Sequence, residues 1–166
     1  MKNGKNLILI GLPGSGKTTV GKLLAKNLGL PLVDVDTALE ENLGCSVPAL
    51  IEARGEADFR RREHDELYSI LKKDGQVVST GGGAVILPEN REILKNRGYV
   101  IFLDRSIDEI LKTLDLTTHP TLRGTTLSQL AKTRRPWYLA CADAVVSADT
   151  VSGAAERCAA LWRERL

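Results

Sequence analysis

The residues with the clearest chemistry are GLPGSGKT at positions 11–18, which match the pattern G-x-x-x-x-G-K-[ST]. They follow an apolar run and open a helical pattern, as a phosphate-binding loop does. Glycines let backbone N–H groups converge on phosphate oxygens, and the following helix directs its N-terminal dipole at the anion. Lys17 would contact the terminal phosphates, and the Thr18 hydroxyl suits Mg²⁺. The motif predicts nucleoside triphosphate binding, with an ordinary glycine-rich turn as the alternative.

The phosphate loop leaves open what is done with the triphosphate, because several enzyme classes share it. The sequence has neither the N-K-x-D motif expected of a GTPase nor the L-S-G-G-Q signature expected of a transporter ATPase. A small-molecule kinase remains, and it needs a second site that holds an acceptor hydroxyl near the γ-phosphate.

A pair of carboxylates, Asp34 and Asp36 in the stretch VDVD, is a candidate for that second site. We expect both on a strand, where residues two apart share a face. The carboxyl ends of parallel strands are where ligands bind in α/β sheets, so both acids should lie near the phosphate loop. A solvated strand end, or a cap by Asp36 on the next helix, is the alternative.

Three further segments could contribute. Consecutive arginines at 60–62 lie on a predicted helix, where at most one or two can face a site and the others form a solvated basic surface. Three glycines at 81–83 follow a buried strand and suggest close approach of the backbone to a ligand. Asp104 ends another apolar run and offers a rival metal carboxylate, but a strand end before the Ser106 cap is the preferred interpretation. His64 is interpreted as helix surface.

The predicted elements that position these residues alternate between strands and helices. Apolar runs predict strands at 6–10, 31–35, 76–79, 99–103 and 143–148. Helical patterns cover 17–29, 37–73, 88–98, 106–114, a segment from Thr126 and 151–165. The long pattern at 37–73 is interrupted near Gly44 and Gly55. Ser106 to Glu109 is a capping box at one helix start, and Thr126 to Gln129 is a second possible one. This alternation predicts an α/β fold, a three-layer sandwich around a five-stranded parallel sheet.

Length and composition fit one domain spanning 1–166, with 43% apolar and 27% charged residues. The net charge of +2 argues against nucleic acid as a partner, and no apolar run approaches the length of a membrane span. Three scattered cysteines form no CxxC pair, so neither a disulfide framework nor a zinc site is indicated. We expect a cytoplasmic monomer.

Taken together, GLPGSGKTTVGKLLAKNLG, DVD, FRRRE, TGGGAV and RRPWY occur in an order and at spacings that resemble shikimate kinases, small kinases with a phosphate loop. The resemblance covers nearly the whole chain. It implies phosphorylation of the 3-hydroxyl of shikimate by ATP and Mg²⁺, a step of aromatic amino acid (chorismate) biosynthesis. It also implies a substrate-binding segment at 34–62 and a lid at 115–126.

The resemblance also implies roles for single residues. Asp34 corresponds to the carboxylate that holds Mg²⁺ through water, with Thr18, and Asp36 to the one that binds shikimate hydroxyls and accepts the proton. Arg60 and Arg134 match the pair that grips the shikimate carboxylate. The expected catalytic residues are Lys17, Asp36 and Arg134. Gly82 and Gly83 match the backbone that closes on the substrate. The expected ATP-binding residues are Gly14, Ser15, Gly16, Lys17, Thr18, Thr19, Lys112, His119 and Arg123.

The lid departs from the family pattern. Family members usually have an arginine before a proline there, whereas this chain has His119 before Pro120. Imidazole carries only partial charge near neutral pH and cannot form a guanidinium fork, so Arg123 is the candidate substitute. Lys112 stands where the family often has an arginine against adenine. Two alternatives stay open: a kinase of another hydroxy acid such as quinate or gluconate, and a nucleotide-binding protein that transfers no phosphate.

Overall fold

The fold is built on a five-stranded parallel sheet with strand order β2-β3-β1-β4-β5. A computed structural model describes residues 6–114 and 124–165. The strands are β1 Asn6–Ile10, β2 Leu32–Asp34, β3 Val77–Ser79, β4 Gly98–Asp104 and β5 Ala144–Ser147. The predicted α/β class and its five-stranded parallel sheet are therefore confirmed.

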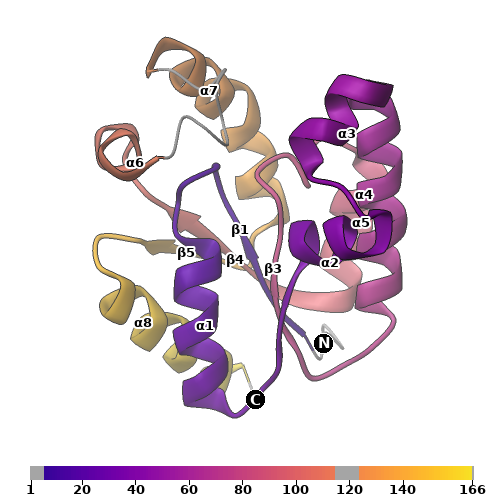
Figure 1. Ribbon diagram of the computed structural model, residues 1–166. Helices are drawn as coiled ribbons and strands as arrows, with labels where there is room; N and C mark the ends of the chain where they lie inside the picture. The colour runs from indigo at the N-terminus through magenta and orange to yellow at the C-terminus, as the bar shows by residue number, and fades with distance from the viewer. Residues whose placement is uncertain (1–5, 115–123, 166) are drawn as a thin grey trace.

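Helices cover both faces of the sheet, which gives three layers (Figure 1). One face packs against α1 (Lys17–Leu28) and α8 (Val151–Glu164). The other packs against α4 (Glu56–Leu71), α5 (Pro88–Arg97), α6 (Ile107–Thr113) and α7 (Gly124–Cys141). The central strand β1 shows why both faces need cover, because its alternating side chains enter the two cores in turn and all five residues are buried.

The predicted helical stretch after β2 consists of three helices. They are α2 (Val35–Leu43), α3 (Val47–Arg54) and α4, and they pack on each other through a small cluster of Leu39, Leu50 and Phe59. Gly44 ends α2 with a φ of 70° and Gly55 ends α3 with a φ of 88°, both conformations that favour glycine. The breaks predicted near these two glycines are confirmed.

Two predicted boundaries were wrong. The strand expected at 31–35 ends at Asp34, and α2 begins at Val35, so Asp36 lies in the first turn of a helix. The α7 helix begins at Gly124, two residues before the capping box expected from Thr126. By contrast, Ser106 caps α6 as predicted, since its hydroxyl accepts a hydrogen bond from the Glu109 N–H at 3.2 Å.

Most of the predicted lid, including His119 and Arg123, lies outside the described residues. Only its last three positions fall inside them, in the first turn of α7. Within the described ranges, no helix is long and apolar enough to cross a membrane.

At the amino ends of the strands, the buried side chain of Asn6 ties three elements together. Its Nδ2 donates to the carbonyl oxygens of Lys73 at 2.8 Å and Arg97 at 3.3 Å, and its Oδ1 accepts from the N–H of Gln76 at 3.1 Å. Asn6 and Gln76 are both buried, and Gln76 Nε2 also donates to the Lys73 carbonyl at 3.0 Å, so the Asn6 amide is part of a buried hydrogen-bond network.

We predict that Asn6→Ala lowers the free energy of unfolding by about 2–4 kcal/mol, because buried donors and acceptors lose their partners. Urea unfolding followed by far-UV circular dichroism measures this. Asn42→Ala is the control, since Asn42 bonds Glu66 at the exposed surface and should cost under about 0.5 kcal/mol. Equal losses in the two variants would refute the role assigned to Asn6.

Candidate active site

The phosphate loop connects β1 to α1 at the carboxyl edge of the sheet. Gly16 is the residue before α1, with a φ of 91°, and no side chain caps the N–H groups of the first turn. A twelve-residue helix with an uncapped N-terminus directs both its free donors and its dipole toward this loop. The backbone geometry is therefore suited to bind a phosphate.

Lys17 is the buried cation of this loop. Its Nζ donates to the carbonyl oxygens of Gly11 at 2.8 Å and Leu12 at 2.9 Å, with the Ser15 hydroxyl at 3.4 Å. Burial lowers the pKa of Lys17 to about 8, although the negative charges of Asp36 and Asp34 act to raise it. The ammonium is thus held within the loop itself.

Two hydroxyls and one carboxylate meet beside α1. The Thr18 hydroxyl donates to Asp34 Oδ2 at 2.6 Å and lies 3.1 Å from the Ser79 hydroxyl. The other oxygen of Asp34 accepts from the Thr37 N–H at 3.0 Å, which makes Asp34 the cap of α2. The capping role suggested by the sequence therefore belongs to Asp34 rather than Asp36.

The oxygens of Thr18 and Asp34 could supply part of the coordination shell of a hard cation such as Mg²⁺. Mg²⁺ usually takes one or two protein oxygens and completes its shell with water and substrate phosphates. Thr18 and Asp34 supply such oxygens next to the phosphate loop. Among the described residues, there is no group of three acidic, histidine or cysteine side chains that could hold a metal ion.

The half-buried Asp36 and the buried Glu63 form an acidic pair around Gly81. A Cβ added to Gly81 would lie 2.9 Å from Glu63 Oε2 and 3.0 Å from Asp36 Oδ1. Both of these oxygens are shielded from water, and neither has a hydrogen-bond partner among the described residues. Burial raises the pKa of Asp36 to about 6, helped by the charge of Glu63 and then of Asp34. Burial also raises the pKa of Glu63, against the charge of Arg60.

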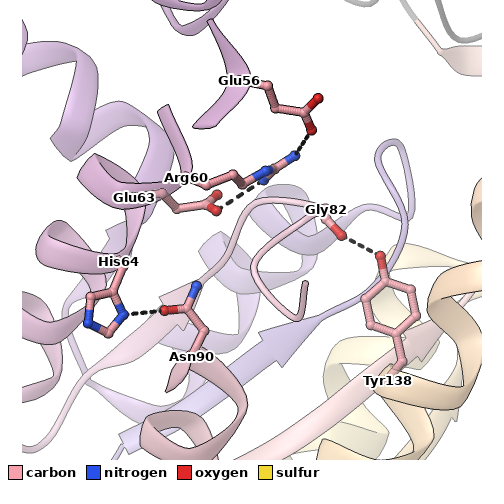
Figure 2. Close-up of polar contacts among 7 residues, drawn as sticks. All are labelled: Glu56, Arg60, Glu63, His64, Gly82, Asn90 and Tyr138. Carbon is pink, nitrogen blue, oxygen red and sulfur yellow. Dashed lines mark hydrogen bonds and ion pairs between the residues drawn. The ribbon is translucent and has the colours of Figure 1, made fainter. Parts of the chain in front are cut away.

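Arg60 lies next to Glu63 and over the glycine loop, and Figure 2 shows its ion pairs with Glu63 and Glu56. Its Nη1 donates to Glu63 Oε1 at 3.0 Å and its Nη2 to Glu56 Oε1 at 3.4 Å. The guanidinium packs directly over Gly83, where any Cβ would overlap it. Its Nε is buried and has no partner in the described part of the chain, which leaves one donor for a ligand.

The other two arginines of the run face elsewhere. Arg61 and Arg62 both pair with Asp58, at 2.9 and 2.7 Å, and the Arg61 side chain is 71% exposed. The prediction that at most one or two of the three could enter a site is confirmed.

Arg134 reaches the site from α7, in spite of its distance in sequence. It is buried, and its positive charge lowers the pKa of Lys17, Glu63 and Tyr138, so it lies near all three. The Gly82 side of the loop contacts the phosphate loop, because a Cβ there would lie 2.5 Å from Pro13. The structure thus brings together the predicted residues Lys17, Thr18, Asp34, Asp36, Arg60, Gly82, Gly83 and Arg134.

Other predicted residues have surface positions or other partners. Thr19 is exposed on α1, and Lys112 pairs with Glu109 at 2.9 Å on the surface of α6. Asp104, the rival metal ligand, pairs with Arg135 at 2.9 Å. His64 was wrongly interpreted as helix surface, because it is half-buried with Nδ1 2.6 Å from Asn90 Oδ1 (Figure 2).

Sequence reasoning missed Glu63 and Tyr138. Glu63 carries a signal that could have found it: it lies four residues from both Phe59 and Leu67, on the apolar side of α4. A carboxylate on that face had to be paired or functional. Tyr138 carries no such signal, since its partner Gly82 is distant in the chain.

The family model and the curated relatives identify the same family. The family model for shikimate kinase matches residues 13–161. A shikimate kinase from Xanthomonas axonopodis pv. citri (strain 306) is 38% identical, covering 98% of this chain and 97% of its own. One from Stenotrophomonas maltophilia (strain R551-3) is 41% identical, covering 93% and 88%.

Solved structures give the same result. The shikimate kinase from Acinetobacter baumannii, solved in complex with shikimate, superposes with a TM-score of 0.89 at 34% identity, covering 99% of this chain and 93% of that one. The chain belongs to the shikimate kinase family.

Proposed function

We propose that this chain transfers the γ-phosphoryl group of ATP to the 3-hydroxyl of shikimate, giving shikimate 3-phosphate for aromatic amino acid (chorismate) biosynthesis. The observation that carries the proposal is the cluster of two acids and two arginines, of which Glu63 and Arg134 are buried and Asp36 and Arg60 half-buried, that faces the phosphate loop across Gly81–Gly83. Such a cluster suits a small acceptor with both a carboxylate and hydroxyls. Family membership and the shikimate complex of the Acinetobacter relative support this choice.

In the proposed acceptor site, Arg60 and Arg134 bind the shikimate carboxylate. Guanidinium groups match a carboxylate with two parallel hydrogen bonds, and burial strengthens such contacts. The unpartnered Nε of Arg60 supports this role, as does the low exposure of both side chains. The Gly82 and Gly83 backbone is proposed to line the same space, where side chains would leave no room.

In the proposed reaction, Asp36 orients the acceptor hydroxyl toward the γ-phosphate and accepts its proton. The buried oxygen of Asp36 that lacks a partner supports this role. A carboxyl pKa of about 6 keeps Asp36 ionised at neutral pH and makes it a stronger base than an exposed aspartate. Phosphoryl transfer has a loose transition state, so positioning of the two reactants dominates.

In the proposed donor site, Lys17 and the loop amides bind the phosphates of ATP. Thr18 and Asp34 would hold Mg²⁺, which neutralises negative charge on the phosphates when bound. The short Thr18–Asp34 contact supports this pairing. Closure of the segment 115–126 over the site is proposed to exclude water, with His119 or Arg123 near the phosphates. A cytoplasmic monomer is the proposed setting, and the three cysteines, which form no disulfide in the described part of the chain, are compatible with it.

We predict ADP release from MgATP that depends on shikimate, measured with a coupled assay. Parallel reactions with quinate, with gluconate and without acceptor should stay near background, because the two arginines and Asp36 must be engaged together. Equal ADP release with all three acids would indicate a broader hydroxy-acid kinase. Release that needs no acceptor, or no release at all, would contradict phosphoryl transfer to shikimate.

We predict that Arg60→Gln raises the KM for shikimate about tenfold or more, since one charged hydrogen-bonding group is lost. Arg60→Lys keeps the positive charge and an ion pair with Glu63 but loses the two-donor geometry of the guanidinium, so it should also raise the KM for shikimate. Arg61→Gln is the matched control and should change nothing, because Arg61 is exposed. Steady-state kinetics at saturating MgATP decide this, and equal KM values in all four proteins would refute the role of Arg60.

We predict that Asp36→Asn lowers kcat at least about 100-fold yet stabilises the protein without ligands. A carboxyl whose pKa is raised by folding from 3.8 to about 6 lowers stability once pH exceeds its unfolded value. Removing the charge should therefore add about 1–3 kcal/mol at pH 7.5, and the gain should vanish as pH falls below about 4. Urea unfolding at several pH values measures this, and a destabilised variant at pH 7.5 would contradict it.

A further inference from the structure

Tyr138 is a buried polar group that the reaction just described does not use. Its ring is 1% exposed and stacks on Phe102, with ring centroids 5.0 Å apart and an interplanar angle of 25°. Its hydroxyl donates a short hydrogen bond to the carbonyl oxygen of Gly82, as Figure 2 shows. The Tyr138 hydroxyl on α7 is therefore bonded to the loop that follows β3.

The loop needs an external tether because it is made of glycines. Three consecutive residues without Cβ can adopt most backbone conformations at similar energy. Within the loop, the Ala84 N–H donates to Gly81 O at 3.1 Å and the Ile86 N–H to Gly83 O at 3.1 Å. The Gly82 carbonyl between them is instead fixed by Tyr138.

Fixing this carbonyl also fixes the neighbouring donor. The peptide unit from Gly82 C=O to Gly83 N–H is planar and trans, so its N–H points opposite to its C=O. When the carbonyl points to Tyr138, the Gly83 N–H must point to the other side. Arg60 packs over Gly83, so the hydrogen bond from Tyr138 to Gly82 also fixes the backbone beneath the Arg60 guanidinium.

Tyr138 lies one helical turn after Arg134 on α7. Arg134 is close enough for its charge to lower the pKa of the hydroxyl, which burial raises to about 12. The hydroxyl therefore stays protonated at any working pH: it donates its hydrogen to Gly82, and its oxygen interacts with the Arg134 side chain. One rigid side chain in this way connects the helix that carries Arg134 to the loop beneath Arg60.

We infer that Tyr138 is a positioning residue for the acceptor site: its hydroxyl holds the Gly82–Gly83 peptide and sets the spacing between Arg134 and Arg60. The inference rests on the proposed function, since it assigns the gripped carboxylate to shikimate. The role is one of geometry, because the hydroxyl donates its hydrogen to the Gly82 carbonyl of the loop.

Tyr138→Phe tests this inference because it removes the hydroxyl and keeps the stacked ring. The KM for shikimate should rise about fivefold, the factor of one net hydrogen bond, while the KM for ATP stays within about twofold. Amide hydrogen exchange of a peptide spanning 79–87 should become faster, with the exchange of β1 and α1 unchanged. Tyr99→Phe is the control, since it removes a half-buried hydroxyl on the α1–α8 side of the sheet.

The outcomes separate this inference from the proposed function. If the unmodified chain phosphorylates no shikimate, the proposed function fails, and hydrogen exchange still decides whether Tyr138 holds the loop. An unchanged exchange rate in 79–87 would overturn the inference. So would an unchanged shikimate KM in an active variant, or a uniform rise in exchange across the chain, which would indicate a purely structural role.

Discussion

The spacing of this site depends on three consecutive positions that have no room for a side chain. Gly81 faces the acids Asp36 and Glu63, Gly82 contacts Pro13 of the phosphate loop, and Gly83 lies under Arg60. Three parts of the molecule therefore converge on a single stretch of backbone. The loop follows β3, which lies between β1 and β2 in the sheet. Because these strands are parallel, the segments that follow them all lie at the same edge of the sheet.

Around that loop, acidic and basic side chains lie close together and are largely shielded from water. Burial lowers the pKa of Lys17 and raises that of Asp36, so each group is less stable as an ion than it would be on the surface. Oxygens of Asp36 and Glu63, and a nitrogen of Arg60, have no partners among the described residues. A stable core would avoid these features, so their presence together marks a binding site that sacrifices stability.

Much of this could be predicted from the sequence because the signals are local. The phosphate loop, the sheet and the helix breaks at Gly44 and Gly55 follow from periodicity and turn residues. The predicted position of Asp36, on a strand, was wrong because Asp34 caps a helix that begins at Val35. The sequence of this stretch is compatible with either a strand or a helix, so the boundary could not be predicted. Tyr138 could not be found, because its partner lies 56 residues away and only packing brings them together.

The most direct test of this account is the binding of shikimate and of a non-hydrolysable ATP analogue to Gly83→Ala, by isothermal titration calorimetry. The added methyl would displace the Arg60 guanidinium without touching the phosphate loop. The account predicts that shikimate affinity falls about tenfold or more while affinity for the analogue is unchanged. Unchanged shikimate affinity, or an equal loss for both ligands, would contradict it.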